Sequence, residues 1–102
     1  MSKEPLQITR RLYDYILDVG FRDDPLLAAL RAETAKLPNA MMQISPEQGQ
    51  FMALLAQLTG ARRAVEIGTF TGYSSLSVAR ALPADGKLVC CDISKEYTDV
   101  AR

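Results

Sequence analysis

The sequence predicts an α/β protein of the Rossmann-like type, in which helices come first and the start of a parallel sheet follows. Two short apolar segments, 64–67 and 87–92, have the length and composition of buried strands. Residues 74–82 between them carry apolar side chains at helical spacing, so the two strands of this strand–helix–strand unit must be parallel. An acid lies at the carboxyl end of each strand, Glu66 in the first and Asp92 in the second.

Amphipathic periodicity predicts three helices before this unit, over about residues 6–19, 25–37 and 46–59. Asp24 is placed to cap the second helix, and a proline follows it at the first helical position. Ser45 and Gln48 have the spacing of a capping box at the start of the third helix, and Gly60 suits its end. A last short helix is expected after the second strand, with Ser94 as its cap.

The composition is that of an ordinary globular domain, since 48% of the 102 residues are apolar and 24% are charged. Twelve basic and twelve acidic residues leave no net charge, so there is no electrostatic reason to expect nucleic acid or a membrane surface as a partner. Met1–Pro5 lacks the apolar stretch of a secretory signal, and a cytoplasmic location is therefore expected. Cys90 and Cys91 are neighbours in a strand and point to opposite faces, which favours buried packing over a disulfide.

A parallel sheet of only two strands would leave open edges and bury little apolar surface. We therefore expect residues 1–102 to be the N-terminal part of a single domain of a longer protein. Within it, the N-terminal helices occupy residues 1–60 and the start of the Rossmann-like core occupies residues 61–102. The alternative is an intact small domain that is completed by self-association.

The turn after the first strand has glycines at Gly68 and Gly72, and it is the part of the sequence that points to a ligand. Phe70 occupies the position where a dinucleotide-binding G-x-G-x-x-G motif requires its second glycine. Glu66 just before the turn would repel a pyrophosphate but attract an ammonium group, and Asp92 is placed to accept two ribose hydroxyls. A ligand with an amino acid at one end and a ribose at the other fits both acids, and S-adenosylmethionine is such a ligand.

Several segments resemble the caffeoyl-CoA/catechol O-methyltransferase family: LYDYIL at 12–17, MQISPEQGQF at 42–51, VEIGTFTGYS at 65–74, and ALP, GK and CD between 81 and 92. The resemblance covers nearly the whole chain. It implies a seven-stranded class I methyltransferase fold and S-adenosylmethionine-dependent transfer of a methyl group to a phenolic or catechol-type hydroxyl. It also implies a divalent metal, usually Mg²⁺, and a homodimer.

Carried over residue by residue, the resemblance implies six cofactor-binding positions: Ile44, Glu66, Gly68, Thr69, Ser74 and Asp92. The family commonly has a threonine or a similar residue where this chain has Ile44, so any contact there would be made by the backbone. No catalytic residue and no metal ligand is carried over, because the family's metal ligands and catalytic base region lie further along than Arg102. The isolated chain is therefore expected to be inactive and to bind the cofactor weakly.

Two other functions stay open at this stage. One is a different Rossmann-like enzyme that uses NAD, which Phe70 and Glu66 disfavour. The other is a non-catalytic fragment or assembly module. The linker 39–44 before the third helix is rich in methionine, and such a segment either packs against a neighbour or lines a pocket.

Overall fold

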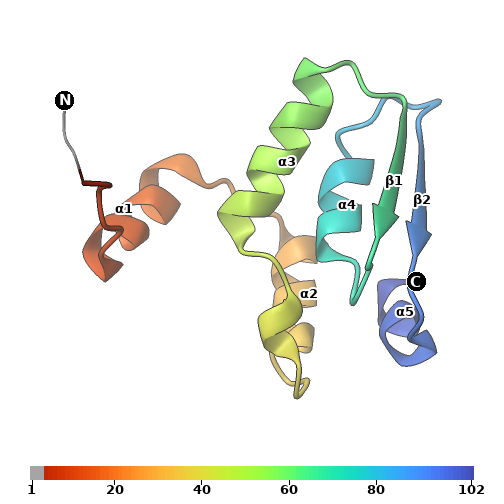
Figure 1. Ribbon diagram of the computed structural model, residues 1–102, viewed down its shortest axis with the longest axis horizontal. Helices are drawn as coiled ribbons and strands as arrows, with labels where there is room; N and C mark the ends of the chain where they lie inside the picture. Colours follow the sequence, from red (N-terminus) through yellow and green to blue (C-terminus); the bar gives the residue numbers. More distant parts are fainter. Residues whose placement is uncertain (1–3) are drawn as a thin grey trace.

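The computed structural model describes residues 4–102. Met1–Lys3 lie outside the described residues, and so does most of the segment Met1–Pro5, from which the absence of a secretory signal is predicted. The predicted order of elements is confirmed: helices come first, and a strand, a helix, a strand and a helix follow (Figure 1). The elements are α1 (Arg10–Gly20), α2 (Pro25–Thr34), the 3₁₀ turn η1 (Ala40–Met42), α3 (Pro46–Leu58), β1 (Arg63–Ile67), α4 (Tyr73–Ala79), β2 (Lys87–Cys91) and α5 (Lys95–Ala101).

The strands β1 and β2 form a parallel two-stranded sheet, in which Arg63 pairs with Lys87 at one end and Ile67 with Cys91 at the other. Helix α4 lies beside the sheet and α3 lies beside α4, so the helices form a layer along the sheet (Figure 1). Residues on one face of the sheet are largely exposed; Val65, Ile67 and Val89 retain 69%, 87% and 56% of their accessible surface. This face is an apolar surface that no other part of residues 4–102 covers.

Helices α3 and α4 pack closely because Gly49 has no side chain. An ideal Cβ built on Gly49 would lie 2.9 Å from Ser77 Oγ and 2.9 Å from Tyr73 Cε1, which is closer than packed atoms approach. Gly49, Tyr73 and Ser77 are all buried. The two helices therefore contact each other through Gly49 on α3 and through Tyr73 and Ser77 on α4. This contact fixes the start of α4 close to the ends of the strands.

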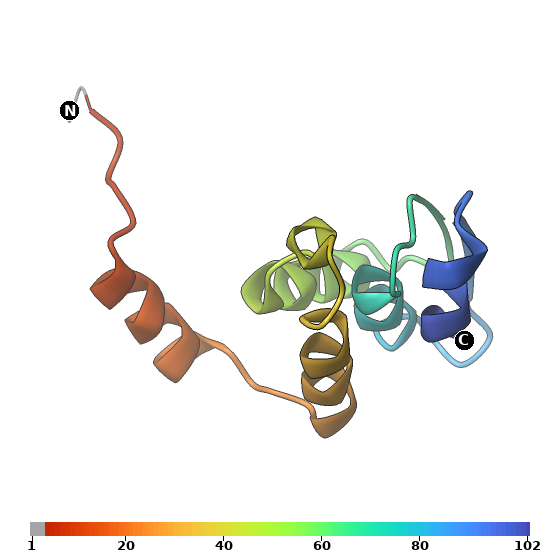
Figure 2. The ribbon, with the colours of Figure 1, turned by 90° about the horizontal axis from the view of Figure 1, so that it is seen from below.

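Helix α1 lies at one end of the molecule, and an extended segment joins it to α2 (Figure 2). Gln50 of α3 holds the end of α1, because its amide donates to the Gly20 carbonyl at 2.7 Å and its Oε1 accepts the Arg22 N–H at 2.9 Å. The Tyr13 hydroxyl also donates to Glu47 at 2.9 Å. Two of these hydrogen bonds connect α1 to α3, the third connects the segment after α1 to α3, and none of the residues in α1 is buried.

Three predicted helix boundaries are wrong. The first helix begins at Arg10 rather than near residue 6, because the Thr9 hydroxyl accepts the N–H of Leu12 and caps the helix there. The second ends at Thr34 rather than at residue 37, since its last residues form tight turns and the Thr34 hydroxyl is bonded to Thr71 in the interior. The helix after the first strand likewise ends at Ala79, and residues 80–82 continue as turns.

Two local predictions are also wrong. The capping box at Ser45 is absent: the Ser45 hydroxyl donates to Glu47 Oε1 at 2.6 Å and makes no bond to the helix backbone. Cys90 and Cys91 are exposed rather than buried, because no element of residues 4–102 covers β2 on its outer side. The caps predicted for the second and last helices are confirmed, with Asp24 and Ser94 accepting backbone N–H groups of the first turn.

Asp24 joins the helix layer together in addition to capping α2. Its Oδ1 accepts the N–H groups of Leu26 at 2.9 Å and Leu27 at 3.2 Å, and its Oδ2 accepts a 2.7 Å hydrogen bond from Arg80, just past the end of α4. The Arg80 guanidinium, and after it the backbone N–H of Leu27, lower the pKa of the Asp24 carboxyl from 3.8 to about 2.

Because the folded-state pKa of Asp24 lies below its unfolded value, its ionised form favours folding at every pH above about 4, and this contribution is lost as the pH falls towards 2. We expect Asp24→Asn to unfold with a shallower dependence on pH across this window than the unchanged chain, as followed by urea denaturation monitored by circular dichroism. Asp14→Asn is the control, since Asp14 pairs with Arg10 within α1. An Asp24→Asn variant with an unchanged pH dependence would contradict this assignment.

Candidate functional site

The turn between β1 and α4 lies at the carboxyl ends of both strands. The Gly68 N–H donates to the Cys91 carbonyl at 2.8 Å, so the turn begins directly beside the end of β2. Gly68 and Gly72 have φ angles of 90° and 91°, in the left-handed region that glycine adopts without strain. No atom lies within 4 Å of the place where a Cβ of Gly68 would be, so this side of the turn is open to a ligand.

Glu66 points towards the first turn of α4, where the hydroxyls of Ser74 and Ser75 donate to its two carboxylate oxygens. Ser74 is one of the predicted cofactor-binding residues, and in the structure its hydroxyl is bonded to Glu66. Ser75, which the sequence analysis did not single out, plays the same part. The pair of hydroxyls orients the carboxylate and leaves lone pairs on both oxygens for a cation.

Asp92 is bonded to the same turn from the end of β2. Its Oδ2 accepts the backbone N–H groups of Thr69 at 2.9 Å and Phe70 at 2.8 Å, and its Oδ1 accepts the N–H of Ser94 at 2.8 Å. These backbone donors, that of Ser94 first and that of Phe70 next, lower the pKa of the Asp92 carboxyl. Asp92 is therefore ionised at neutral pH and connects the turn to the start of α5.

Five of the six predicted cofactor positions line one cavity of about 180 Å³ at the strand ends: Ile44, Glu66, Gly68, Thr69 and Ser74. Asp92 lies in an adjoining cavity of about 560 Å³, together with Ile93 and Tyr97. The two cavities share Met42, Ile67 and Gly68 in their walls. The structure thus brings the two acids to either side of the same turn, and the assignment of the six residues to a cofactor stays a prediction.

The linker between α2 and α3 covers the turn from the outside. Asn39 donates to the Tyr97 hydroxyl at 2.6 Å, and the Tyr97 ring meets the ring of buried Phe70 edge-on at 4.7 Å. The hydroxyls of Thr34 and Thr71, both fully buried, are 2.8 Å apart. Met42 of this methionine-rich linker lines both cavities at the strand ends. Of the two alternatives for the linker, packing against a neighbour or lining a pocket, the structure shows the second.

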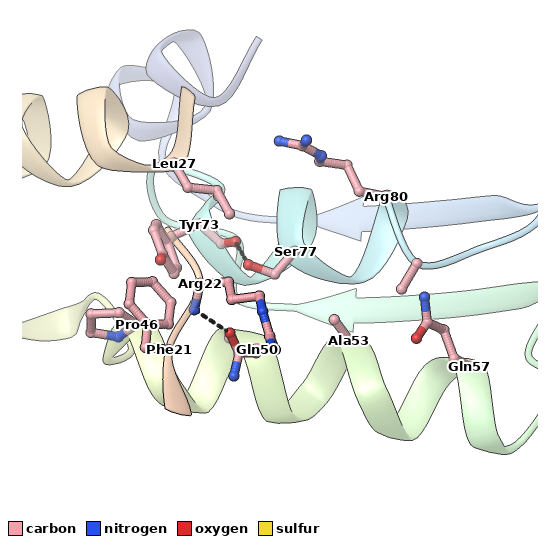
Figure 3. A pocket seen from close by; sticks show the side chains of 12 residues that line it. Phe21, Arg22, Leu27, Pro46, Gln50, Ala53, Gln57, Tyr73, Ser77 and Arg80 are labelled. Carbon is pink, nitrogen blue, oxygen red and sulfur yellow. Dashed lines mark hydrogen bonds between the residues drawn. The ribbon is translucent and has the colours of Figure 1, made fainter. Parts of the chain in front are cut away.

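A separate cavity of about 190 Å³ lies between α3, α4 and the segment that precedes α2 (Figure 3). Phe21, Gln50 and Ser77 are among its lining residues, and Gln50 accepts a hydrogen bond from the backbone N–H of Arg22, which also lines it. None of the six predicted cofactor residues lines it. It is a gap between packed helices, and the candidate site lies at the strand ends.

The divalent metal implied by the resemblance does not fit the residues present. Within residues 4–102, no group of three or more histidine, cysteine, aspartate or glutamate side chains is arranged to hold a metal ion.

No helix in the same part of the chain combines the length and the hydropathy that a membrane span requires.

Comparison with known proteins decides the family. The profile of the O-methyltransferase family matches residues 18–102. The chain belongs to the O-methyltransferase family. It is 45% identical over 91 residues to caffeoyl-CoA O-methyltransferase 2 of Petunia hybrida, in a match that covers 87% of this chain and 38% of that protein. The resemblance seen in the sequence is confirmed.

Solved structures support the same fold. The O-methyltransferase from Bacillus cereus in complex with SAH matches with a TM-score of 0.79 and 38% identity, over 87% of this chain and 40% of that chain. An SAH-bound methyltransferase of Podospora anserina matches with a TM-score of 0.86 over 98% of this chain and 45% of that chain, and at 21% identity it shows the fold alone. The predicted Rossmann-like class I methyltransferase fold is confirmed for the part that this chain spans, which is less than half of either structure.

Proposed function

We propose that this chain is the cofactor-binding part of an S-adenosylmethionine-dependent O-methyltransferase that acts on a phenolic or catechol-type hydroxyl. The observation that carries the proposal is the position of Glu66 and Asp92, which flank the Gly68 turn at the ends of neighbouring strands. Two anionic groups on either side of one turn suit a ligand with an ammonium group at one end and a ribose at the other. Family membership supports the same choice of ligand.

In this proposal the six residues divide the binding of the cofactor among them. Glu66 accepts hydrogen bonds from the ammonium group of the methionine part, and Asp92 accepts from the ribose. Gly68 leaves room for the ligand, because a side chain there would point into the open side of the turn. Ile44, Thr69 and Ser74 border the cavity and offer backbone or hydroxyl contacts. When bound, the sulfonium cofactor supplies the electrophilic methyl group, and these residues orient it.

The remaining features of the whole enzyme are proposals that rest on family membership. The chain spans 38% of the length of the Petunia relative, so residues 1–102 are proposed to be the N-terminal part of one methyltransferase domain, with helices over 1–60 and the start of the core over 61–102. The phenolic acceptor, the homodimer, the cytoplasmic location and the participation of a divalent metal are proposed for the complete enzyme. For the isolated chain we propose weak cofactor binding without turnover, and methylation of a catechol by these 102 residues would contradict that.

A titration followed by nuclear magnetic resonance (NMR) tests the cofactor assignment, since it detects weak binding. The ¹⁵N-labelled chain is titrated with S-adenosylhomocysteine, the demethylated cofactor, and separately with NAD⁺. We expect S-adenosylhomocysteine to shift the backbone amides of residues 66–74 and 92–97, and NAD⁺ to leave them in place. Shifts with NAD⁺ alone would favour the other Rossmann-like enzyme, and no shift with either ligand would favour a non-catalytic assembly module.

A further inference from the structure

The turn from residue 68 to residue 72 has an unusual backbone. Three of its five residues have left-handed φ angles: 90° at Gly68, 51° at Phe70 and 91° at Gly72. The two glycines adopt such angles freely, but Phe70 has a Cβ, which makes the left-handed region unfavourable. Phe70 is also buried, so its conformation is not a feature of a loose surface loop. Something in the surrounding structure must hold the turn in this form.

The Asp92 carboxylate is hydrogen-bonded to the backbone of this turn. Both N–H groups at the centre of the turn, those of Thr69 and Phe70, donate to the single oxygen Oδ2 at 2.9 Å and 2.8 Å. The other oxygen, Oδ1, accepts the N–H of Ser94 at 2.8 Å. A carboxylate has about four acceptor positions in all, two on each oxygen. Oδ2 is therefore fully used, and Oδ1 has one position that no further hydrogen bond occupies, although the backbone N–H of Ile93 lies near enough to the carboxylate to help lower its pKa.

Glu66 differs from Asp92 in the donors that it receives. Hydroxyls of Ser74 and Ser75 bond to Glu66, and a hydroxyl can rotate towards another acceptor without any change in the backbone. The donors to Asp92 are backbone N–H groups, which can leave the carboxylate only if the turn itself moves. A ligand that takes hydrogen-bonding positions on Glu66 therefore leaves the chain in place, while one that needs two positions on Asp92 does not.

We infer that Asp92 is a positioning residue that holds the 68–72 turn in its left-handed form, and that a ribose with two hydroxyls on this carboxylate releases one of the two turn N–H groups. One hydroxyl takes the free position on Oδ1, and the other displaces the N–H of Thr69 or Phe70 from Oδ2. Cofactor binding and the conformation of the turn are thereby coupled. The part that concerns the ribose rests on the proposed function, and the part that concerns the ligand-free turn does not.

Two NMR measurements on the 102-residue chain test the ligand-free part. Scalar couplings across hydrogen bonds are expected between the amide nitrogens of Thr69 and Phe70 and the side-chain carboxyl carbon of Asp92. Amide hydrogen exchange at these two residues is expected to be roughly tenfold faster or more in Asp92→Asn, the scale for loss of a hydrogen bond to a charged acceptor. Asp99→Asn, which removes the partner of Lys95 on α5, is the control and should leave both amides unchanged.

Absence of both couplings in the unchanged chain would overturn the inference, and this measurement does not depend on whether Asp92→Asn folds. On saturation with S-adenosylhomocysteine, one of the two couplings should disappear, while the amides of Ser74 and Ser75 keep their ligand-free exchange rates. If the ligand binds and both couplings persist, the coupling between ribose and turn is wrong. If the ligand does not bind while both couplings are present, the proposed function fails and the role of Asp92 in the turn stands.

Discussion

Replacing Arg31 by alanine is expected to lower the free energy of unfolding by about 1.5–3 kcal/mol, the scale of a lost hydrogen bond to a charged group. Arg31 is the centre of the contact between α2 and α4: it donates to Asp23 at 2.5 Å and to the Tyr73 hydroxyl at 2.8 Å. Its guanidinium carbon also lies 5.6 Å from the ring centres of both Phe21 and Tyr73, within the range of cation–π attraction. Urea denaturation at neutral pH measures the change.

Arg31→Lys separates the geometry of the side chain from its charge. A lysine keeps the positive charge but lacks the planar fork that reaches two partners at once, so this variant should recover only part of the loss. Arg11→Ala removes an exposed arginine from α1 and should change stability by less than about 0.5 kcal/mol, as for other surface substitutions. Equal stabilities for the Arg31→Ala and Arg11→Ala variants would show that the Arg31 contacts do not stabilise the fold.

Gly49→Ala is expected to destabilise the chain even though alanine favours helices more than glycine does. The new Cβ would lie 2.9 Å from both Ser77 Oγ and Tyr73 Cε1, and Tyr73 is buried, so the two helices have to separate. Overpacking of this kind costs typically about 1–3 kcal/mol, which outweighs the gain of up to about 1 kcal/mol from helix propensity.

Gly20→Ala provides a matched control for the same chemical change. No atom lies within 4 Å of the place where a Cβ of Gly20 would be, and its φ angle is negative, so alanine should be neutral or slightly stabilising there. Urea denaturation is therefore expected to show a clear loss of stability in Gly49→Ala and none in Gly20→Ala. A Gly49→Ala variant as stable as the unchanged chain would mean that α3 and α4 do not pack as closely as the structure shows.

The sequence carries most of the signal for the fold because its elements are marked locally. Asp24 followed by proline marks the start of α2, and Gly60, with a φ angle of 62°, follows the end of α3. The two strands are short apolar runs that end in acids, and both were predicted within one residue of their observed bounds. Helix ends that depend on distant contacts could not be predicted, since α2 ends where Thr34 meets Thr71 across the interior.

The same distinction applies to the candidate site. Glu66, Gly68 and Asp92 can be picked out because their residue types recur at strand ends and turns in this kind of fold. The hydrogen-bond partners of Glu66 and Asp92 could not be predicted. Ser75, which donates to Glu66, is one of several serines in the sequence. Thr69 and Phe70 donate to Asp92 through backbone N–H groups, which do not depend on the type of side chain. Tyr97 and Asn39 lie 58 positions apart, and only the fold brings them into contact.

Several apolar residues that the spacing of the sequence predicts to be buried are exposed in the structure. Phe51 and Leu58 of α3 recur at helical spacing, yet they retain 57% and 73% of their accessible surface. Val65 and Ile67 of β1 are exposed in the same way. A periodic pattern indicates that a face is apolar, but not what covers it. For the part of the chain that the structure describes, these faces have no covering element.

The central claim is that Glu66 and Asp92 bind opposite ends of one sulfonium nucleoside, and the two halves of the ligand test it directly. Affinities of the unchanged chain, Glu66→Gln and Asp92→Asn are measured by NMR titration with S-adenosylhomocysteine, homocysteine and adenosine. We predict that each substitution weakens S-adenosylhomocysteine binding by about 1.5–3 kcal/mol. Glu66→Gln should weaken homocysteine binding and spare adenosine, and Asp92→Asn should do the reverse. If both substitutions weaken the same half, or if neither changes the affinity for the whole ligand, the claim is contradicted.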